Sequence, residues 1–138
     1  MPLIMWTPDL AVGVPKFDDQ HKQLFKAADD LAEAMWEGKG TDEVMKTIDF
    51  MVEYTAFHFN DEEATMTKIG YPEYAGHKQS HVRFVSEVDD LKKKYQAGEL
   101  SSGLAIEVLT KACNWFREHI RLTDKALGDY IQEKGLSA

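Results

Sequence analysis

Residues 58–81 read HFNDEEATMTKIGYPEYAGHKQSH, and they indicate the fold most clearly because they span two helical patterns and the turn between them. Before the turn, His58 and Glu62 are four residues apart, and after it His77 and His81 have the same spacing. Residues four apart share one face of a helix. The Gly-Tyr-Pro triplet between them is a stop signal, since glycine ends helices and proline cannot continue them. The stretch therefore predicts two helices joined by a short turn.

The same helical spacing extends outward in both directions from this hairpin. Apolar residues or histidines recur at steps of three and four along each segment, and glycines near 38–40 and 98 interrupt the pattern. Because the breaks are short, sequential helices should lie antiparallel to one another. We therefore expect an all-α fold, an up-down-up-down antiparallel four-helix bundle, with an irregular N-terminal arm at residues 1–17. The expected helices span about residues 18–37, 42–69, 73–96 and 101–134.

Length, charge and composition limit the class of protein. The chain has 138 residues, of which 43% are hydrophobic and 29% charged, so we expect one soluble domain over residues 1–138. A net charge of −8 argues against nucleic acid or an anionic membrane as partner, because both require a basic surface. No apolar run approaches the ~18 residues of a membrane span. With a poor signal-peptide pattern and one cysteine, Cys113, we expect a cytoplasmic monomer with that thiol in the core.

Every histidine in the chain lies in step with the apolar face of its helix, and two acids accompany them. Buried imidazoles without partners cost roughly 1–3 kcal/mol each, and an unpaired buried carboxylate is very rare. One such histidine would be an ordinary core residue, but five histidines from four helices need a common partner. Metal ions satisfy such a set together, and the candidate ligands are His21, His58, Glu62, His77, His81, His119 and Asp124.

The order of these residues resembles the hemerythrin family. The first helix carries one histidine, the second His-x-x-x-Glu, the third His-x-x-x-His and the fourth His-x-x-x-x-Asp. Trp6, the Asp-Asp-Gln-His run at 18–21 and the Gly-Tyr-Pro triplet are also similar to family features. The resemblance covers nearly the whole chain. It implies a non-haem centre of two iron ions, Fe²⁺ or Fe³⁺, with an oxo or hydroxo bridge.

The resemblance also implies a role for each ligand. One iron would be held by His77, His81 and His119, and the other by His21 and His58, with Glu62 and Asp124 bridging the pair. Together with the single-atom oxo or hydroxo bridge, these groups supply one bond fewer than two octahedral ions require, so the iron with two histidines keeps a vacant position. Dioxygen would bind there reversibly, as in a carrier, storage or delivery protein rather than an enzyme. An oxygen-consuming protein would then be its partner.

Several apolar side chains lie within a helical turn of the candidate ligands. They contribute to packing, and we expect some of them to exclude water from the vacant position as the wall of an oxygen pocket. The candidates are Leu24, Phe59, Trp115, Phe116, Ile120 and Leu122.

Other uses of the same residues remain open at this point. An oxygen- or nitric-oxide-sensing domain would keep the site and pass its state to a partner. A di-iron oxidase or peroxide-scavenging enzyme is a further alternative, but such enzymes carry Glu-x-x-His on each of two helices, and this chain has no such motif. A bundle without metal would leave the five interior histidines unexplained.

His119 and Asp124 set a geometric problem, because both must reach the interior from one helix. Five residues turn an α-helix by about 500°, which leaves the two side chains roughly 140° apart. The helix could end between them, the aspartate could reach around from the flank, or the helix could widen locally into a π-turn. The apolar row continues to Ile131, which argues against an end. We favour the π-turn, which is common at functional sites.

Overall fold

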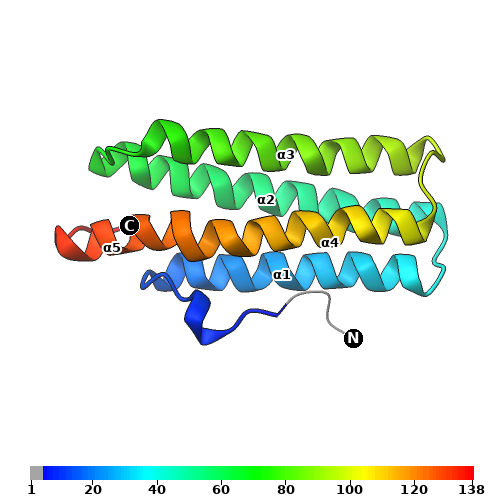
Figure 1. The fold of residues 1–138 in the computed structure, drawn as a ribbon, viewed down its shortest axis with the longest axis horizontal. Helices are drawn as coiled ribbons and strands as arrows, with labels where there is room; N and C mark the ends of the chain where they lie inside the picture. Colours follow the sequence, from blue (N-terminus) through cyan, green and yellow to red (C-terminus); the bar gives the residue numbers. More distant parts are fainter. Residues whose placement is uncertain (1–4) are drawn as a thin grey trace.

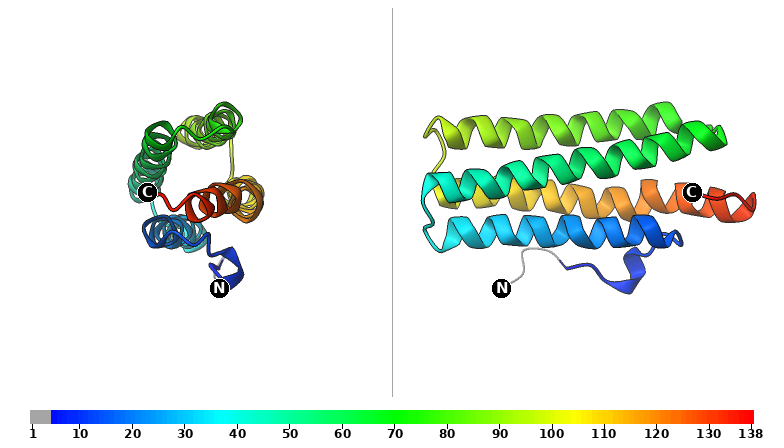
Figure 2. Two further views of the ribbon diagram at one scale, coloured as in Figure 1. Left: turned by 90° about the vertical axis from the view of Figure 1, so that its left-hand side faces the viewer. Right: turned by 180° about the vertical axis from the view of Figure 1, so that it is seen from behind.

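A computed structural model describes residues 5–138, and these residues form helices joined by turns and short irregular segments, with no strand among them. A short 3₁₀ turn, η1 (Pro8–Leu10), precedes four long helices, α1 (Pro15–Trp36), α2 (Thr41–Ile69), α3 (Tyr74–Gln96) and α4 (Ser102–His119). The last of these continues through η2 (Ile120–Asp124) into α5 (Lys125–Glu133). Figure 1 shows the long helices side by side, and the end-on view in Figure 2 shows them around a common centre. The predicted all-α four-helix bundle is confirmed.

The turn between α2 and α3 forms as its sequence predicts. Gly70 adopts a φ of 66°, a left-handed conformation that favours glycine, and it ends α2. The Tyr71 N–H donates to the Met66 carbonyl oxygen at 2.9 Å, which satisfies one of the last carbonyls of the helix. The next helix begins at Tyr74, so the two helices are antiparallel neighbours.

The helix boundaries differ in places from those that the sequence predicts. Helix α1 begins at Pro15 rather than near residue 18, because proline suits the first turn of a helix, where its missing N–H costs nothing. The fourth segment reaches Glu133, but it is not one regular helix, since η2 interrupts it. No helix within residues 5–138 is both long enough and apolar enough to cross a membrane.

The N-terminal arm packs against the end of the bundle. Val12 is fully buried, and its N–H donates to an Asp18 carboxylate oxygen at 2.8 Å. The arm backbone lies directly on Gly128 of α5, where a Cβ would stand only 1.9 Å from the Val12 carbonyl oxygen. Gln132, one turn further on, donates from Nε2 to the Gly13 carbonyl oxygen at 2.9 Å. The arm therefore connects α5 to the start of α1.

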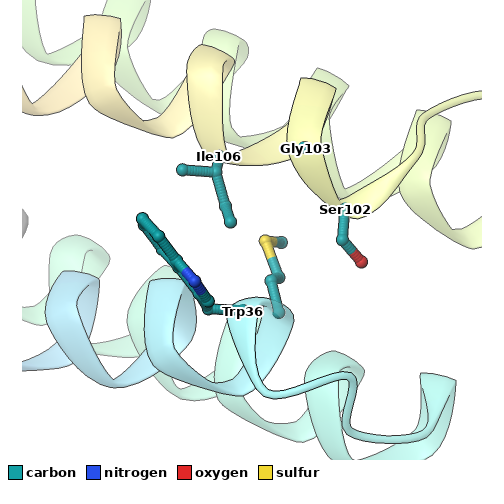
Figure 3. A pocket seen from close by; sticks show the side chains of 5 residues that line it. Trp36, Ser102, Gly103 and Ile106 are labelled. Carbon is teal, nitrogen blue, oxygen red and sulfur yellow. The ribbon is translucent and has the colours of Figure 1, made fainter.

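The bundle interior differs between its two ends. The end where α1 leads into α2 has apolar layers; this apolar end buries Leu31, Met35, Val44, Ile48, Leu91, Ala105 and Leu109. On its surface, Trp36 and Ile106 line a groove between α1 and α4 (Figure 3). At the opposite end, where α2 leads into α3, the same inward positions carry histidines and acids.

Candidate metal centre

All seven candidate ligands lie in the bundle interior, and none of their side chains is more than 5% exposed. Helix α1 contributes one histidine, α2 a histidine and a glutamate, α3 two histidines, α4 one histidine and η2 the aspartate. The spacing explains this arrangement, because residues four apart on α2 and on α3 share one inward face. The structure thus brings together every residue of the predicted set: His21, His58, Glu62, His77, His81, His119 and Asp124.

The candidate ligand atoms fall into two groups that share both acids. One group has three histidines and the other has two, and within each group one ligand atom from every residue lies within 4.8 Å of the others. This is also the division that the family resemblance implies. The three-histidine group is Glu62, His77, His81, His119 and Asp124, and the two-histidine group is His21, His58, Glu62 and Asp124.

Each acid directs its two oxygens towards different groups. Glu62 places Oε1 2.8 Å from His77 Nε2 and Oε2 2.8 Å from His58 Nε2. Asp124 likewise places Oδ1 2.8 Å from His77 Nε2 and Oδ2 3.0 Å from His21 Nε2. A carboxylate that spans two sets of imidazole nitrogens in this way is oriented to bridge two ions.

The polar atoms at the centre of the site lack hydrogen-bond partners, although they lie close together. This is true of Nε2 in all five histidines and of both oxygens in each acid. A buried donor or acceptor without a partner costs about 1–3 kcal/mol, and a charged one costs more. Imidazole nitrogens and carboxylate oxygens that converge at contact distance without hydrogen-bond geometry are suited to transition-metal ions such as iron. The residues present therefore fit a di-metal centre.

The π-turn predicted between His119 and Asp124 is confirmed. Residues 120–124 form η2, a single widened turn in which the Lys125 N–H donates to the Ile120 carbonyl oxygen five residues earlier. The chain is α-helical on both sides of η2, so the helix does not end there, and the aspartate does not reach around an unbroken helix. The extra residue in the turn rotates Asp124 onto the inward face shared with His119.

Contacts between the histidines and the acids shift the pKa values of both. Burial by itself lowers the pKa of His21 and His77, but contacts with Asp124 and Glu62 outweigh that effect and raise each pKa to about 9. Burial would raise the pKa of the two acids, but the neighbouring histidines hold it well below the usual range. Both acids are therefore carboxylates at neutral pH. A metal ion must displace protons from the two histidines, so its affinity should rise with pH.

Two polar residues outside the predicted ligand set contact the outer nitrogens of histidines. Gln20 Oε1 accepts from His58 Nδ1 at 2.6 Å, and Glu63 Oε2 accepts from His81 Nδ1 at 3.0 Å. With the proton on Nδ1, the Nε2 atom of each ring is free to bind metal. The position of Gln20 beside a candidate ligand could have indicated this role, whereas nothing in the sequence distinguishes Glu63 from other acids on α2.

Aromatic rings cover the faces of the candidate ligands. Phe59 stacks on His81, with ring centroids 3.8 Å apart and planes inclined by 4°. Trp115 stacks on His119 at 5.0 Å. Phe116 lies between the two groups and has ring contacts with histidines of both. These rings restrict the orientation of the imidazoles and exclude water from their surroundings.

Of the remaining pocket candidates, Leu24 and Ile120 are buried, but Leu122 is not. The Leu122 side chain is 60% exposed, so the prediction that it lines an interior pocket is wrong. The reason is η2, because the widened turn that brings Asp124 inward rotates Leu122 outward. A regular helix would have placed Leu122 on the same face as His119, three residues earlier.

Comparison with known proteins agrees with this geometry. Residues 12–131 match the hemerythrin HHE cation binding domain family. The chain is 34% identical over 134 residues to a bacteriohemerythrin of Stenotrophomonas maltophilia, an alignment that covers 96% of this chain and 84% of the relative. The chain belongs to the hemerythrin family.

Further family members extend the comparison. A bacteriohemerythrin of Methylococcus capsulatus is 33% identical over 129 residues, which cover 93% of this chain and 96% of the relative. Among solved structures, wild-type hemerythrin has a TM-score of 0.83 and 33% identity and covers 92% of this chain and 96% of its own. A hemerythrin variant with one leucine replaced by tyrosine has a TM-score of 0.85 and 33% identity, and the match covers 94% of this chain and 97% of the variant. The hemerythrin fold is therefore shared over nearly the whole chain.

Proposed function

We propose that this protein binds dioxygen reversibly at a non-haem di-iron centre formed by the seven buried ligands. The observation that carries the proposal is the orientation of Glu62 and Asp124, each of which directs one oxygen to each group of histidines. Membership of the hemerythrin family supports iron as the metal. When bound, the iron pair supplies two electrons to dioxygen and regains them when dioxygen leaves.

The unequal histidine groups differentiate the two irons in this proposal. The three-histidine group would complete the coordination of one ion, together with the bridging carboxylates and a bridging oxo or hydroxo group. The two-histidine group, His21 and His58, would leave one position vacant on the other ion. We therefore assign dioxygen binding to the side of the site that these two histidines form.

The surrounding side chains keep this part of the bundle dry. Phe116 has an edge-on ring contact with His21 at 5.9 Å. Leu24, three residues after His21, and Ile120, next to His119, are both buried. Phe59 and Trp115 cover the other group of histidines. Exclusion of water limits proton delivery and so limits the loss of dioxygen in a reduced form.

We infer an oxygen carrier, storage or delivery protein rather than an enzyme. A ligand set dominated by neutral imidazoles donates less negative charge than one dominated by carboxylates, and this favours release of intact dioxygen over cleavage of its O–O bond. A cytoplasmic monomer that delivers oxygen to an oxygen-consuming protein completes the proposal. Sedimentation of the iron-loaded protein should give the mass of a single chain.

Metal analysis and absorption spectroscopy test the proposal directly. The iron-loaded protein should contain two iron ions per chain. Its spectrum in air should contain a visible band that disappears when dioxygen is removed under argon and returns on re-exposure, through repeated cycles. One ion per chain, or a band that cannot be regenerated without a reductant, would contradict reversible dioxygen binding.

A pair of alanine variants tests the shielding. Phe116→Ala should admit water beside the two-histidine group and accelerate autoxidation severalfold, as followed by loss of the oxygen-dependent band. Leu122→Ala is the matched control, because it removes a large apolar side chain from η2 that already faces solvent. Equal autoxidation rates in the two variants would exclude a shielding role for Phe116.

A further inference from the structure

In each group, one histidine donates from its outer nitrogen Nδ1 to a neighbouring side chain, and the charge of that side chain differs between the groups. His81 Nδ1 donates to the Glu63 carboxylate at 3.0 Å, whereas His58 Nδ1 donates to the Gln20 amide oxygen at 2.6 Å. Both rings are at least 98% buried, and both present Nε2 to an oxygen of Glu62. The two arrangements are alike in geometry, but one outer partner is anionic and the other is neutral.

The surroundings preserve this difference. The Glu63 side chain is 18% exposed, and within residues 5–138 its carboxylate forms an ion pair with His81 only. The Gln20 Nε2 donates to Asp61 Oδ2 at 2.8 Å, which orients the amide so that its oxygen faces His58. Asp61 in turn lies 3.4 Å from a lysine ammonium, which offsets its charge. At the outer Nδ1 atom, a carboxylate therefore acts directly on His81, whereas the nearest outer carboxylate reaches His58 only through the Gln20 amide.

An anionic partner changes the strength of a metal-binding imidazole. A carboxylate that accepts from Nδ1 draws the proton towards itself and makes Nε2 a stronger electron donor, as in the carboxylate–histidine–metal arrangements of other proteins. A neutral amide orients the ring equally well but increases its donor strength less. The affinity for the ion that His81 binds should consequently be higher than three histidines without an anionic partner would give.

We propose that Glu63 is a positioning residue that makes the three-histidine group the tighter of two metal sites, so that this site fills first. Gln20 orients His58 without adding charge and leaves the two-histidine group as the weaker site, which fills second. The inference rests on the proposed function, because it takes the seven buried residues to be metal ligands.

Stepwise titration of the metal-free protein with Co²⁺ tests this order without reference to oxygen binding. Co²⁺ accepts the same nitrogen and oxygen ligands as Fe²⁺, and its visible absorption reports each site. The wild-type protein should bind two ions in two separate steps. Glu63→Gln keeps the hydrogen-bond acceptor but removes the charge, so it should weaken the first step about 10–100-fold and leave the second unchanged.

The reciprocal variant moves the charge to the other group. Gln20→Glu is combined with Asp61→Asn, so that the new carboxylate faces an amide rather than a second carboxylate. This double variant should tighten the second step and reduce the gap between the two steps. In the Zn²⁺-loaded protein, the ¹⁵N resonance of His81 Nδ1 should shift in Glu63→Gln, while that of His58 Nδ1 should not.

Glu118→Gln is the control for a general electrostatic effect. Glu118 is next to His119 in the sequence, but its carboxylate pairs with Arg121 and contacts no histidine ring. Both binding steps should therefore remain as in the wild type. An unchanged first step in folded Glu63→Gln, or equal weakening of both steps, would overturn the role of Glu63. A wild-type protein that binds fewer than two ions would instead overturn the di-metal proposal on which the inference rests.

Discussion

The two ends of this bundle are formed by the same four helices, but only one end holds a cluster of histidines and acids in its interior. The apolar end removes hydrophobic surface from water, which stabilises the fold by about 25 cal/mol per Å². The metal-centre end buries seven polar side chains whose central atoms have no hydrogen-bond partners, which is unfavourable until a ligand binds. The apolar end is therefore stabilised by burial alone, whereas the metal-centre end needs a bound ligand to offset the cost of its buried polar groups.

The irregular features of the chain are concentrated at the metal-centre end. The π-turn η2, the buried arm and the close contact at Gly128 all lie there, whereas the apolar end consists of regular helix and short turns. Such departures from regular geometry are expected at functional sites, where side chains need a particular orientation as well as close packing.

Removal of iron should have the largest effect, and it should act through the metal-centre end. At free iron a thousandfold above Kd, each bound ion stabilises the folded state by about 4 kcal/mol. Chelation should therefore lower the midpoint of thermal unfolding by at least roughly 10 °C, as measured by calorimetry. If the midpoint were the same with and without chelator, the buried ligands would not be coupled to metal.

A core truncation at the apolar end should destabilise the protein without affecting the metal centre. Ile48 is fully buried, so Ile48→Ala should lower the free energy of unfolding by about 2–5 kcal/mol, with an unchanged content of two iron ions per chain. Urea unfolding and metal analysis measure both quantities. Phe50→Ala, at a side chain 54% exposed on the same helix, should change stability by less than about 0.5 kcal/mol. Loss of iron from Ile48→Ala would show that the two ends are not independent.

Substitution of a helical glycine should have a smaller effect that depends on its place in the bundle. Gly128→Ala introduces a Cβ only 1.9 Å from the Val12 carbonyl oxygen, so the arm must shift at a cost of about 1–3 kcal/mol. Gly76→Ala is the control, because nothing lies within 4 Å of the new Cβ and alanine favours helix by about 0.8–1 kcal/mol. In chemical unfolding, Gly128→Ala should lower the free energy of unfolding and Gly76→Ala should raise it. Changes of equal sign would exclude the contact with the arm as the cause.

The slightest change is expected when the folded protein meets a thiol reagent, because its one cysteine, Cys113, lies buried on α4 between the two ends. Burial, followed by the charge of Asp29, raises the pKa of its thiol to about 12. Because the thiolate is the reactive form, iodoacetamide at pH 8 should modify the folded protein far more slowly than the urea-unfolded chain, as followed by mass spectrometry. Rapid modification of the folded protein would show that this part of the bundle opens readily. The predicted core position of Cys113 is confirmed.

Much of the fold could be predicted from local spacing. The four-residue intervals between His58 and Glu62 and between His77 and His81 determine which side chains share a helix face, whatever the helix later packs against. His119 and Asp124 cannot share a face of a regular helix, because five residues do not return to one face. A local irregularity was therefore predictable, and the π-turn is its observed form.

Contacts between helices were decided only by the tertiary structure. Glu62 and Glu63 are adjacent on one helix, so their side chains point about 100° apart. The rotation of α2 against α3 decides that Glu62 lies between the histidine groups and Glu63 behind His81. Leu122 lies within η2, and this widened turn directs its side chain to solvent rather than to the pocket. By itself the sequence determined the directions of side chains within each helix, since these follow from bond geometry. The rotation of one helix against another depends on packing over the whole interface, which no short stretch of sequence contains.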